Sequence, residues 1–304
     1  MAYHSIVCVK QVPDTANVTA EAMKDDGTVN RGALPTIFNP EDLHALETAL
    51  ETKERFGGTV TVLTMGPPKA ADVLRDCLFR GADRAILLTD RRAAASDTLA
   101  TSYIISQAIK KIGSFDFVFC GRQAIDGDTA QVGPQTADKL DIPQVTYLEE
   151  LVSLEGKTAQ IRRNIGHGWE VIEAELPILV TVVDTANTPR PQAVRRVMQF
   201  KKARVPAELA MEVRRAMPDA TDEERQAEVD ARLAALKKAD YPVEQWDLDD
   251  IGADLERCGL SGSPTKVFRV QSIVLTKEGF TEIAPTEDGV RQMIQELVVD
   301  RTLG

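Results

Sequence analysis

The stretch GRQAIDGDTAQV at residues 121–132 combines small residues with hydrogen-bonding side chains. Its glycines, with Gly133 just beyond, allow a backbone to come close to a bound group. Its polar side chains are Gln123, Asp126, Asp128, Thr129 and Gln131. Thr129 can cap a following helix and face a phosphate, the glutamines can bind a ribose or a base, and the aspartates suit a turn, a cap or a ribose hydroxyl. A nucleotide site and a purely structural Asx-rich turn both fit this pattern.

Other kinds of chemistry find little support in the chain. The loop matches neither GxGxxG nor GxxxxGK[ST]. The cysteines and histidines are scattered: Cys8, Cys77, Cys120, Cys258, His4, His44 and His167. We therefore expect free thiols in a reducing compartment, no metal site, and no side chain acting as a catalytic acid, base or nucleophile.

Composition narrows the class further. The chain has 304 residues, a net charge of -11 and an isoelectric point near 4.9. That balance argues against a nucleic-acid partner. No apolar run approaches the ~18 residues of a membrane span, and the first ten residues, MAYHSIVCVK, read as a strand and not as a signal peptide. We expect a cytoplasmic protein.

The elements that must position the loop alternate along the first half of the chain. Continuous apolar runs predict strands at 5–10, 59–65, 84–90 and 115–121. Helical spacing and end signals predict helices at 40–56, 67–80, 96–113 and 129–140, the first capped by Asn39 and the third by Ser96 or Asp97. The alternation predicts a doubly wound parallel α/β sheet of the flavodoxin or Rossmann kind. Ligands bind such sheets beyond the carboxyl ends of the strands, near the switch in strand order.

The second half of the chain changes character. Alternating segments at 144–175 predict an antiparallel hairpin excursion, and the apolar run 177–184 predicts a strand back in the main sheet. The segment 186–206 is then expected to leave the domain, and its prolines argue against regular structure there. We expect an α/β nucleotide-binding domain at 1–203, a helical acidic insertion at 204–240 with a capping box at Thr221 and Glu224, and a C-terminal arm at 241–304. The arm reads as loop up to a strand near 266–273, and a helix follows at 286–300.

Five segments carry a family resemblance: VCVKQVPD (7–14), NPEDLHALETAL (39–50), GPPKAADVLRDCLFRGADRAI (66–86), GRQAIDGDTAQVGPQTA (121–137) and LPILVTVV (176–183). Read together, they resemble the beta subunit of electron transfer flavoproteins. The resemblance covers residues 4–203 in order and 241–300 more loosely. It implies an adenine nucleotide in this cleft and a heterodimer with an alpha subunit that carries an electron-shuttling FAD. The C-terminal arm would then pack on the alpha subunit.

The resemblance also implies which residues contact the nucleotide. They are Cys8 after the first strand, Asn39, Pro40, Glu41 and Asp42 in the second contact segment, Met65 after the second strand, and the loop residues Gly121, Arg122, Gln123, Ala124, Ile125, Asp126, Gly127, Asp128, Thr129, Ala130, Gln131 and Val132.

The nucleotide itself is implied to be FAD, with AMP as the alternative. GDTAQVGP, VKQVPDT and SDTLATSY resemble the bifurcating, FixA-like members, in which a second FAD takes hydride from NADH, and Thr98 is the added flavin contact. Electrons would pass to ferredoxin or flavodoxin and, through the alpha subunit, to a dehydrogenase. Lys10 or Arg122 could stabilise an anionic reduced flavin, although both also fit surface ion pairs.

A partner-docking segment is implied at 189–202. Val194 takes the anchor position that a leucine holds in respiratory members, and Arg195 and Arg196 could steer an acidic, acyl-CoA dehydrogenase-like partner. The insertion could contact a specialised partner. Two other classes compete with this interpretation: an AMP- or ATP-binding stress-type regulatory protein, and a nucleotide-hydrolysing or adenylating enzyme, for which the chain lacks an SGGxDS-like motif.

Overall fold

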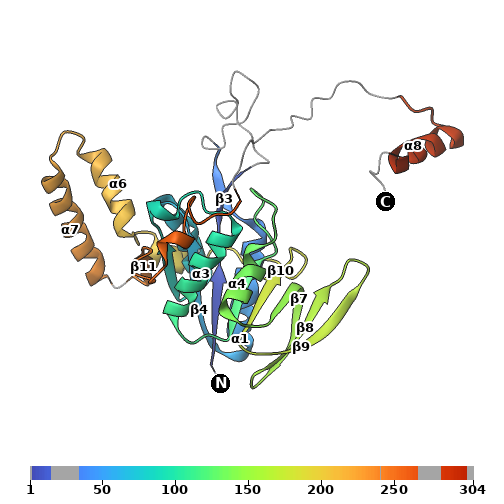
Figure 1. The fold of residues 1–304 in the computed structure, drawn as a ribbon, viewed down its shortest axis with the longest axis horizontal. Coiled ribbons are helices and arrows are strands. Elements are labelled where there is room, and N and C mark those ends of the chain that lie inside the picture. Colours follow the sequence, from blue (N-terminus) through green and yellow to red (C-terminus); the bar gives the residue numbers. More distant parts are fainter. Residues whose placement is uncertain (1, 15–33, 240, 266–281, 300–304) are drawn as a thin grey trace.

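The computed structural model describes residues 2–14, 34–239, 241–265 and 282–299 (Figure 1). Nine strands of this part form one sheet in the order β11-β5-β4-β1-β6-β10-β7-β8-β9. Their bounds are β1 Tyr3–Cys8, β4 Gly58–Met65, β5 Arg84–Leu88, β6 Phe117–Gly121, β7 Gln144–Glu155, β8 Thr158–Asn164, β9 Trp169–Glu175, β10 Ile178–Val182 and β11 Val243–Trp246. Two short antiparallel strands that the sequence analysis missed, β2 Gln11–Pro13 and β3 Thr36–Phe38, pair beside the sheet.

The predicted doubly wound sheet is confirmed. Strands β11 to β7 in this order are all parallel to their neighbours. From β1 the chain runs outward to β4 and β5, then returns past β1 to β6 and β10. The strand order therefore switches direction between β1 and β6, the place where such folds bind ligands.

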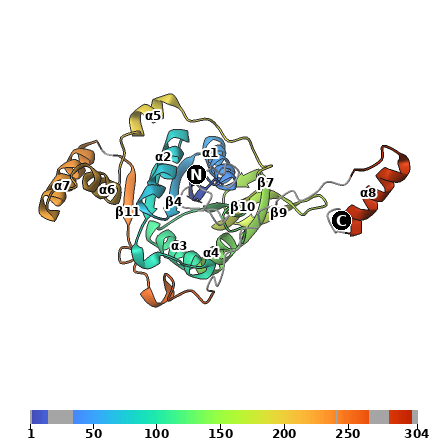
Figure 2. The same ribbon diagram turned by 90° about the horizontal axis from the view of Figure 1, so that it is seen from above.

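Helices cover both faces of the sheet (Figure 2). On one face lie α1 Pro40–Phe56 and α2 Ala71–Arg80, and on the other α3 Thr98–Ile112 and α4 Val132–Leu140. Strand β6 shows why its apolar run is continuous: Phe117 and Phe119 pack with the α1 side, while Val118 and Cys120 pack with the α3 side. The two phenylalanine rings stack with centroids 5.2 Å apart.

The predicted start of α1 is confirmed, with Asn39 before it and Pro40 at the first helical position, but the side chain of Asn39 makes no capping hydrogen bond. The predicted start of the helix after β6 is wrong. Helix α4 begins at Val132, so Thr129 lies in the preceding loop and does not cap it. The start of α3 is confirmed, because Asp97 accepts a hydrogen bond from the N–H of Ala100.

The antiparallel excursion is confirmed. Strands β7, β8 and β9 pair antiparallel to one another, and β10 returns between β6 and β7 as predicted. One face of this extension adds Leu151, Ile161 and Ala159 to the core under α1.

The region after β10 is more regular than the prolines suggested. It contains α5 Val194–Phe200, α6 Pro206–Ala216 and α7 Asp222–Lys238. Helices α6 and α7 form a hairpin beside the sheet with its own small cluster of Leu209, Val213 and Val229. The capping box of Thr221 and Glu224 is confirmed at the start of α7.

The residues after 240 partly return to the main sheet. Strand β11 pairs with β5 and extends the sheet at its edge, so the expected boundary at 241 is not a boundary of the sheet. Helix α8 Glu287–Val299 lies apart from the sheet (Figure 1). The strand expected near 266–273 and Thr15 of the VKQVPDT segment lie outside the described residues. The described residues also include the short 3-10 helices η3 Pro68–Ala70, η4 Arg91–Ala93 and η5 Leu255–Arg257.

Candidate nucleotide site

The loops after β1 and β6 meet at the switch point, as expected. Cys8 and Cys120 are in-register neighbours at the carboxyl ends of these two strands. Lys10 follows β1, and its ammonium group pairs with Asp126 of the loop after β6 at 2.7 Å. The loop at 121–131 is therefore tied directly to the edge where a ligand would bind.

The side chain of Asn39 binds the backbone of this loop. It is fully buried, and both polar atoms of its amide are engaged with the loop backbone. Its Nδ2 donates to the carbonyl of Gln123 at 2.9 Å, and its Oδ1 accepts from the N–H of Ile125 at 3.1 Å. The side chain that the sequence suggested as a helix cap thus fixes a segment more than 80 residues away in sequence.

The carboxylates of Glu41 and Asp42, in the first turn of α1, bind the start of the same loop. Glu41 accepts from the N–H of Gln123 at 2.8 Å and from the guanidinium of Arg122 at 2.6 Å. Asp42 accepts from the N–H of Lys10 at 2.9 Å and of Gly121 at 3.1 Å, which joins the ends of β1 and β6. Both carboxylates are buried; three of their four oxygens accept from backbone N–H groups, and the fourth accepts from the guanidinium of Arg122.

The burial of Asp42 has an electrostatic consequence. Removal of the carboxylate from water raises its pKa to about 7, although hydrogen bonds from Asn39, Gly121 and Lys10 act in the opposite direction. The effect of burial is larger than that of the hydrogen bonds. Asp42 therefore binds the two backbone N–H groups at an energetic cost to its own ionised form.

The glycines of the loop serve different purposes. A Cβ on Gly121 would lie 2.5 Å from Oδ1 of Asp42, so this glycine permits close approach of α1 and not of a ligand. A Cβ on Gly133 would lie 3.1 Å from the Thr181 side chain, where α4 packs on β10. Gly127 faces open space at the exposed tip of the loop. Of the three, Gly127 alone has the open surroundings that approach of a ligand requires.

The tip of the loop, residues 126–131, is exposed and unusually shaped. Asp128 and Ala130, on either side of Thr129, have positive φ angles of 49° and 52°. Non-glycine residues seldom adopt this conformation, and such strain concentrates at ligand-binding sites. Backbone of this kind can gather N–H groups into an anion-binding surface. The amide of Gln123 steadies the tip by donating to Asp128 at 3.0 Å.

Thr98 forms the next part of the edge. Its hydroxyl, in the first turn of α3, donates to Oε1 of Gln131 at 2.8 Å. One turn further along, Ser102 donates to Gln135 at 3.2 Å. Helices α3 and α4 therefore carry a row of polar contacts that begins beside the loop tip.

The Cys120 thiol at the base of this edge is poorly reactive. Cys120 is buried, and its contact with Cys8 together with burial raises its pKa well above the ordinary value. Met65, at the end of β4, is half-buried and packs with the same core as Cys8. These side chains are suited to forming an apolar floor.

One residue at this edge was not found from the sequence. Tyr147 has a φ of 63° within β7, and Arg122 lies over its ring at 5.9 Å. Its N–H donates to the hydroxyl of Thr181 in β10. The alternating pattern of β7 gave no signal of this irregular backbone.

The segment expected to dock a partner lies away from this edge, on α5. Val194 is 79% exposed and Arg195 is exposed, whereas Arg196 is half-buried and donates to the carbonyls of Leu78 and Ala82. Arg196 thus attaches α5 to the end of α2. None of the described residues forms a cluster of His, Cys, Asp or Glu able to hold a metal ion. No helix in the described ranges has the length and apolar character needed to cross a bilayer.

The structure is that of a doubly wound α/β protein with polar loops at its switch point, which is where proteins of this class bind ligands. A sequence profile described as the electron transfer flavoprotein domain matches residues 26–212. The chain belongs to the electron transfer flavoprotein family, which confirms the resemblance and gives the chain an electron-transfer role.

Individual relatives match over most of their length. The electron transfer flavoprotein subunit beta of Clostridium acetobutylicum is 40% identical over 96% of each chain. Protein FixA of Sinorhizobium fredii is 41% identical over 97% of this chain and 92% of FixA. Subunit CarD of the caffeyl-CoA reductase-Etf complex of Acetobacterium woodii is 42% identical over 87% and 86%.

Proposed function

We propose that this chain is the beta subunit of a heterodimeric electron transfer flavoprotein and binds FAD at the edge formed by β1, β6 and α3. Electrons from NADH would be divided between a low-potential ferredoxin or flavodoxin and, through the FAD of the alpha subunit, a dehydrogenase. The observation that carries the proposal is the loop at 121–131, which is locked from beneath by Asn39, Glu41 and Asp42 while its strained tip is left open.

The residues of this edge fit a dinucleotide. The N–H groups of Gly127 and Asp128 donate to the carbonyl of Ala124 within the loop, so the N–H groups of Thr129 and Ala130, with the first turn of α4, are the ones that suit phosphate oxygens. Thr98 and Gln131 extend the polar edge beyond the phosphate loop and suit a second ring system. When bound, FAD would supply hydride acceptance and electron release, and the chain would supply position and electrostatics.

Charged groups at the edge are already paired within the protein. Lys10 pairs with Asp126 and Arg122 with Glu41. Of the two, Lys10 lies beside the open tip of the loop, and its ammonium would favour a negative charge on a neighbouring group. Arg122 is held by the buried Glu41, which suits it to supporting the loop.

AMP is the alternative ligand. It would need the phosphate loop and an adenine slot but would leave Thr98 without a ligand to contact. The similarity to FixA proteins supports the resemblance to bifurcating, FixA-like members, for which a second FAD is implied, and the name of CarD places that relative in a complex with a caffeyl-CoA reductase. The latter name also supports a partner dehydrogenase that acts on a CoA thioester, docked at Val194 and Arg195 of α5.

The test is a count of nucleotides in the intact heterodimer. The chain is co-expressed with its alpha subunit, the ligands are released by denaturation, and FAD and AMP are quantified by chromatography. Two FAD and no AMP per heterodimer is the expected result. One FAD and one AMP would make the protein a simple electron shuttle and would remove the role assigned to Thr98. No nucleotide beyond the FAD of the alpha subunit would contradict the site itself.

Variants then locate the ligand. Thr129→Val is expected to lower the nucleotide content, because Thr129 lies between the two strained residues of the tip. Gln226→Leu on α7, which removes an exposed hydrogen bond to Asp230, serves as the control. Equal nucleotide content in both variants would contradict the placement of the phosphates at the tip.

A further inference from the structure

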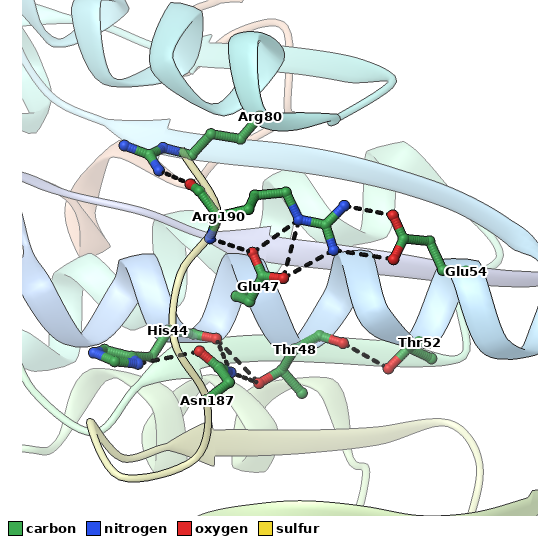
Figure 3. Close-up of polar contacts among 8 residues, drawn as sticks. All are labelled: His44, Glu47, Thr48, Thr52, Glu54, Arg80, Asn187 and Arg190. Carbon is green, nitrogen blue, oxygen red and sulfur yellow. Dashed lines mark hydrogen bonds and ion pairs between the residues drawn. The ribbon is translucent and has the colours of Figure 1, made fainter. Parts of the chain in front are cut away.

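Residues 184–193 form a strap between β10 and α5 that crosses α1 (Figure 3). Its first anchor is Asn187, whose Nδ2 donates to the carbonyl of His44 at 3.0 Å and to the hydroxyl of Thr48 at 2.9 Å. The ring of His44 lies 3.1 Å from Oδ1 of the same amide. The chain leaving the sheet is therefore bound to α1 at once, whereas the sequence analysis expected it to leave the domain.

Arg190 is the second and stronger anchor. Its backbone N–H donates to Glu47 at 2.9 Å, and its guanidinium reaches both oxygens of Glu47 at 2.8–3.0 Å and both oxygens of Glu54. Glu47 is only 5% exposed. Arg190 lowers the pKa of Glu54, which shows that the pairing favours the ionised carboxylate. The single planar guanidinium group of Arg190 thus joins two carboxylates that lie about two helical turns apart on α1.

From Arg190 the strap leads directly into α5. Arg80 of α2 donates to the carbonyl of Arg190 itself, and Gln192 donates to Asp76 at 3.0 Å. The N–H of Ala193 then donates to the carbonyl of Phe79 at 3.0 Å. Arg196 bound to the end of α2 fixes the first half of α5, and Phe200, buried in the core, fixes its last residue.

The outer side of α5 exposes two apolar side chains beside Arg195 and Gln199. Val194 is 79% exposed and Met198, one turn later, is 62% exposed. Helix α5 spans only seven residues, which is too short to be stable on its own. Its orientation must come from the strap and from α2.

We infer that Arg190 is a positioning residue for partner docking: by joining Glu47 and Glu54 it fixes the strap so that Val194 and Met198 face the dehydrogenase before the two proteins meet. The inference rests on the proposed docking role of α5. A docking surface ordered in advance binds more tightly because the ordering is complete before association. Loss of the anchor weakens the encounter and leaves electron transfer within the bound complex unchanged.

The test uses the intact heterodimer with a purified flavin-dependent acyl-CoA dehydrogenase as acceptor. The rate of electron transfer is measured against dehydrogenase concentration for the wild type, Arg190→Gln, Arg190→Lys and Val194→Asp. Arg163→Gln, which removes a partly exposed pair with Glu170 on the β8–β9 hairpin at the opposite edge of the sheet, is the matched control. Released nucleotides are counted in every variant.

Arg190→Gln is expected to raise the half-saturating concentration of dehydrogenase by about 10-fold, with the rate at saturation and the nucleotide content unchanged. Arg190→Lys gives a smaller increase, because lysine keeps the charge but cannot bind two carboxylates as a fork. Hydrogen exchange of the backbone N–H groups at 187–201 becomes faster in Arg190→Gln and not in Arg163→Gln.

Each remaining outcome counts against a different claim. If Val194→Asp weakens docking and Arg190→Gln does not, the positioning role is wrong and the docking role stands. If neither variant changes the half-saturating concentration, docking at α5 is wrong and the inference falls with it. If Arg190→Gln lowers the saturated rate and the nucleotide content together, Arg190 has a general structural role.

Discussion

Helix α1 and the residue before it hold two distant segments in two different ways. At the N-terminal end, Asn39, Glu41 and Asp42 are buried and bind mainly backbone groups of the 121–125 loop and of Lys10. Farther along, Glu47 and Glu54 bind the partly exposed guanidinium of Arg190. Hydrogen bonds in a dry environment are costly to break and insensitive to salt, whereas charges near water are screened. The loop at 121–125 is thus fixed rigidly, and the strap at 184–193 is held more weakly.

Asp42→Ala is expected to have the largest effect. It leaves the N–H groups of Lys10 and Gly121 buried without acceptors, and each orphaned donor costs about 1–3 kcal/mol. We expect a loss of about 3 kcal/mol of unfolding free energy, measured by chemical denaturation, and a matching loss of bound nucleotide. If unfolding free energy and nucleotide content both stayed near wild type, the loop would not depend on this carboxyl group.

Gly121→Ala attacks the same junction from the other side. Its Cβ would lie 2.5 Å from Oδ1 of Asp42 and 2.7 Å from backbone atoms of Glu41 and Asp42. Backbone cannot yield as a flexible side chain does, so a loss of about 2–3 kcal/mol is expected. Thermal unfolding of the heterodimer measures it, and a melting temperature equal to that of the wild type would show that α1 can move away from the loop.

The pH dependence of stability separates the two anchoring modes. The pKa of Asp42 is raised from 3.8 to about 7 in the folded protein. Its stabilising contribution is therefore complete below pH 3.8 and is lost as the pH rises toward 7. Between pH 5 and pH 8 the wild type should lose roughly 2–3 kcal/mol relative to Asp42→Asn, since other titrating groups are common to both. Parallel stability curves for the two proteins would mean that Asp42 does not titrate in this range.

The sequence alone predicted those features of the fold that depend on residues close together in the chain. Apolar runs followed by helical spacing predicted the parallel sheet, because strand and helix signals are local. The loop at 121–132 was found from its glycines and polar residues. Its anchoring was not, because Asn39 contacts residues 84 and 86 positions away. The amide of asparagine suits a helix cap and a distant backbone equally well, and only packing decides between them.

Proline was the source of the main error in the second half. Pro206 was taken as a sign of irregular chain, yet it is the first residue of α6, where its missing N–H does no harm. Strand β11 was missed because its four residues are extended only by pairing with β5 at the edge of the sheet. The positive φ of Tyr147 likewise follows from tertiary contacts and leaves no pattern in the sequence.

The ion pair on the strap should respond to salt. In a double-mutant cycle with Glu47→Gln and Arg190→Gln, we expect a coupling of about 1–2 kcal/mol in unfolding free energy at low salt, because Glu47 is buried and Arg190 is not. The coupling should fall at an ionic strength of about 0.5 M, since the exposed partner is screened. An Asn39→Ala variant measured in parallel should show no such salt dependence. A coupling unaffected by salt would place both anchors in the same class and remove the contrast between them.

The smallest effect on stability is expected at Gly127. A Cβ there meets no atom within 4 Å, so Gly127→Ala should change the unfolding free energy by less than about 0.5 kcal/mol. The same change places a methyl group at the open tip where the proposed ligand would lie. Reduced nucleotide content with unchanged stability would therefore show an effect on binding alone. Substitutions of the buried residues Asn39, Glu41 and Asp42 cannot show this, because they change folding as well. Unchanged nucleotide content would mean that the ligand keeps clear of Gly127 and depends on the neighbouring backbone at Asp128 and Ala130 instead.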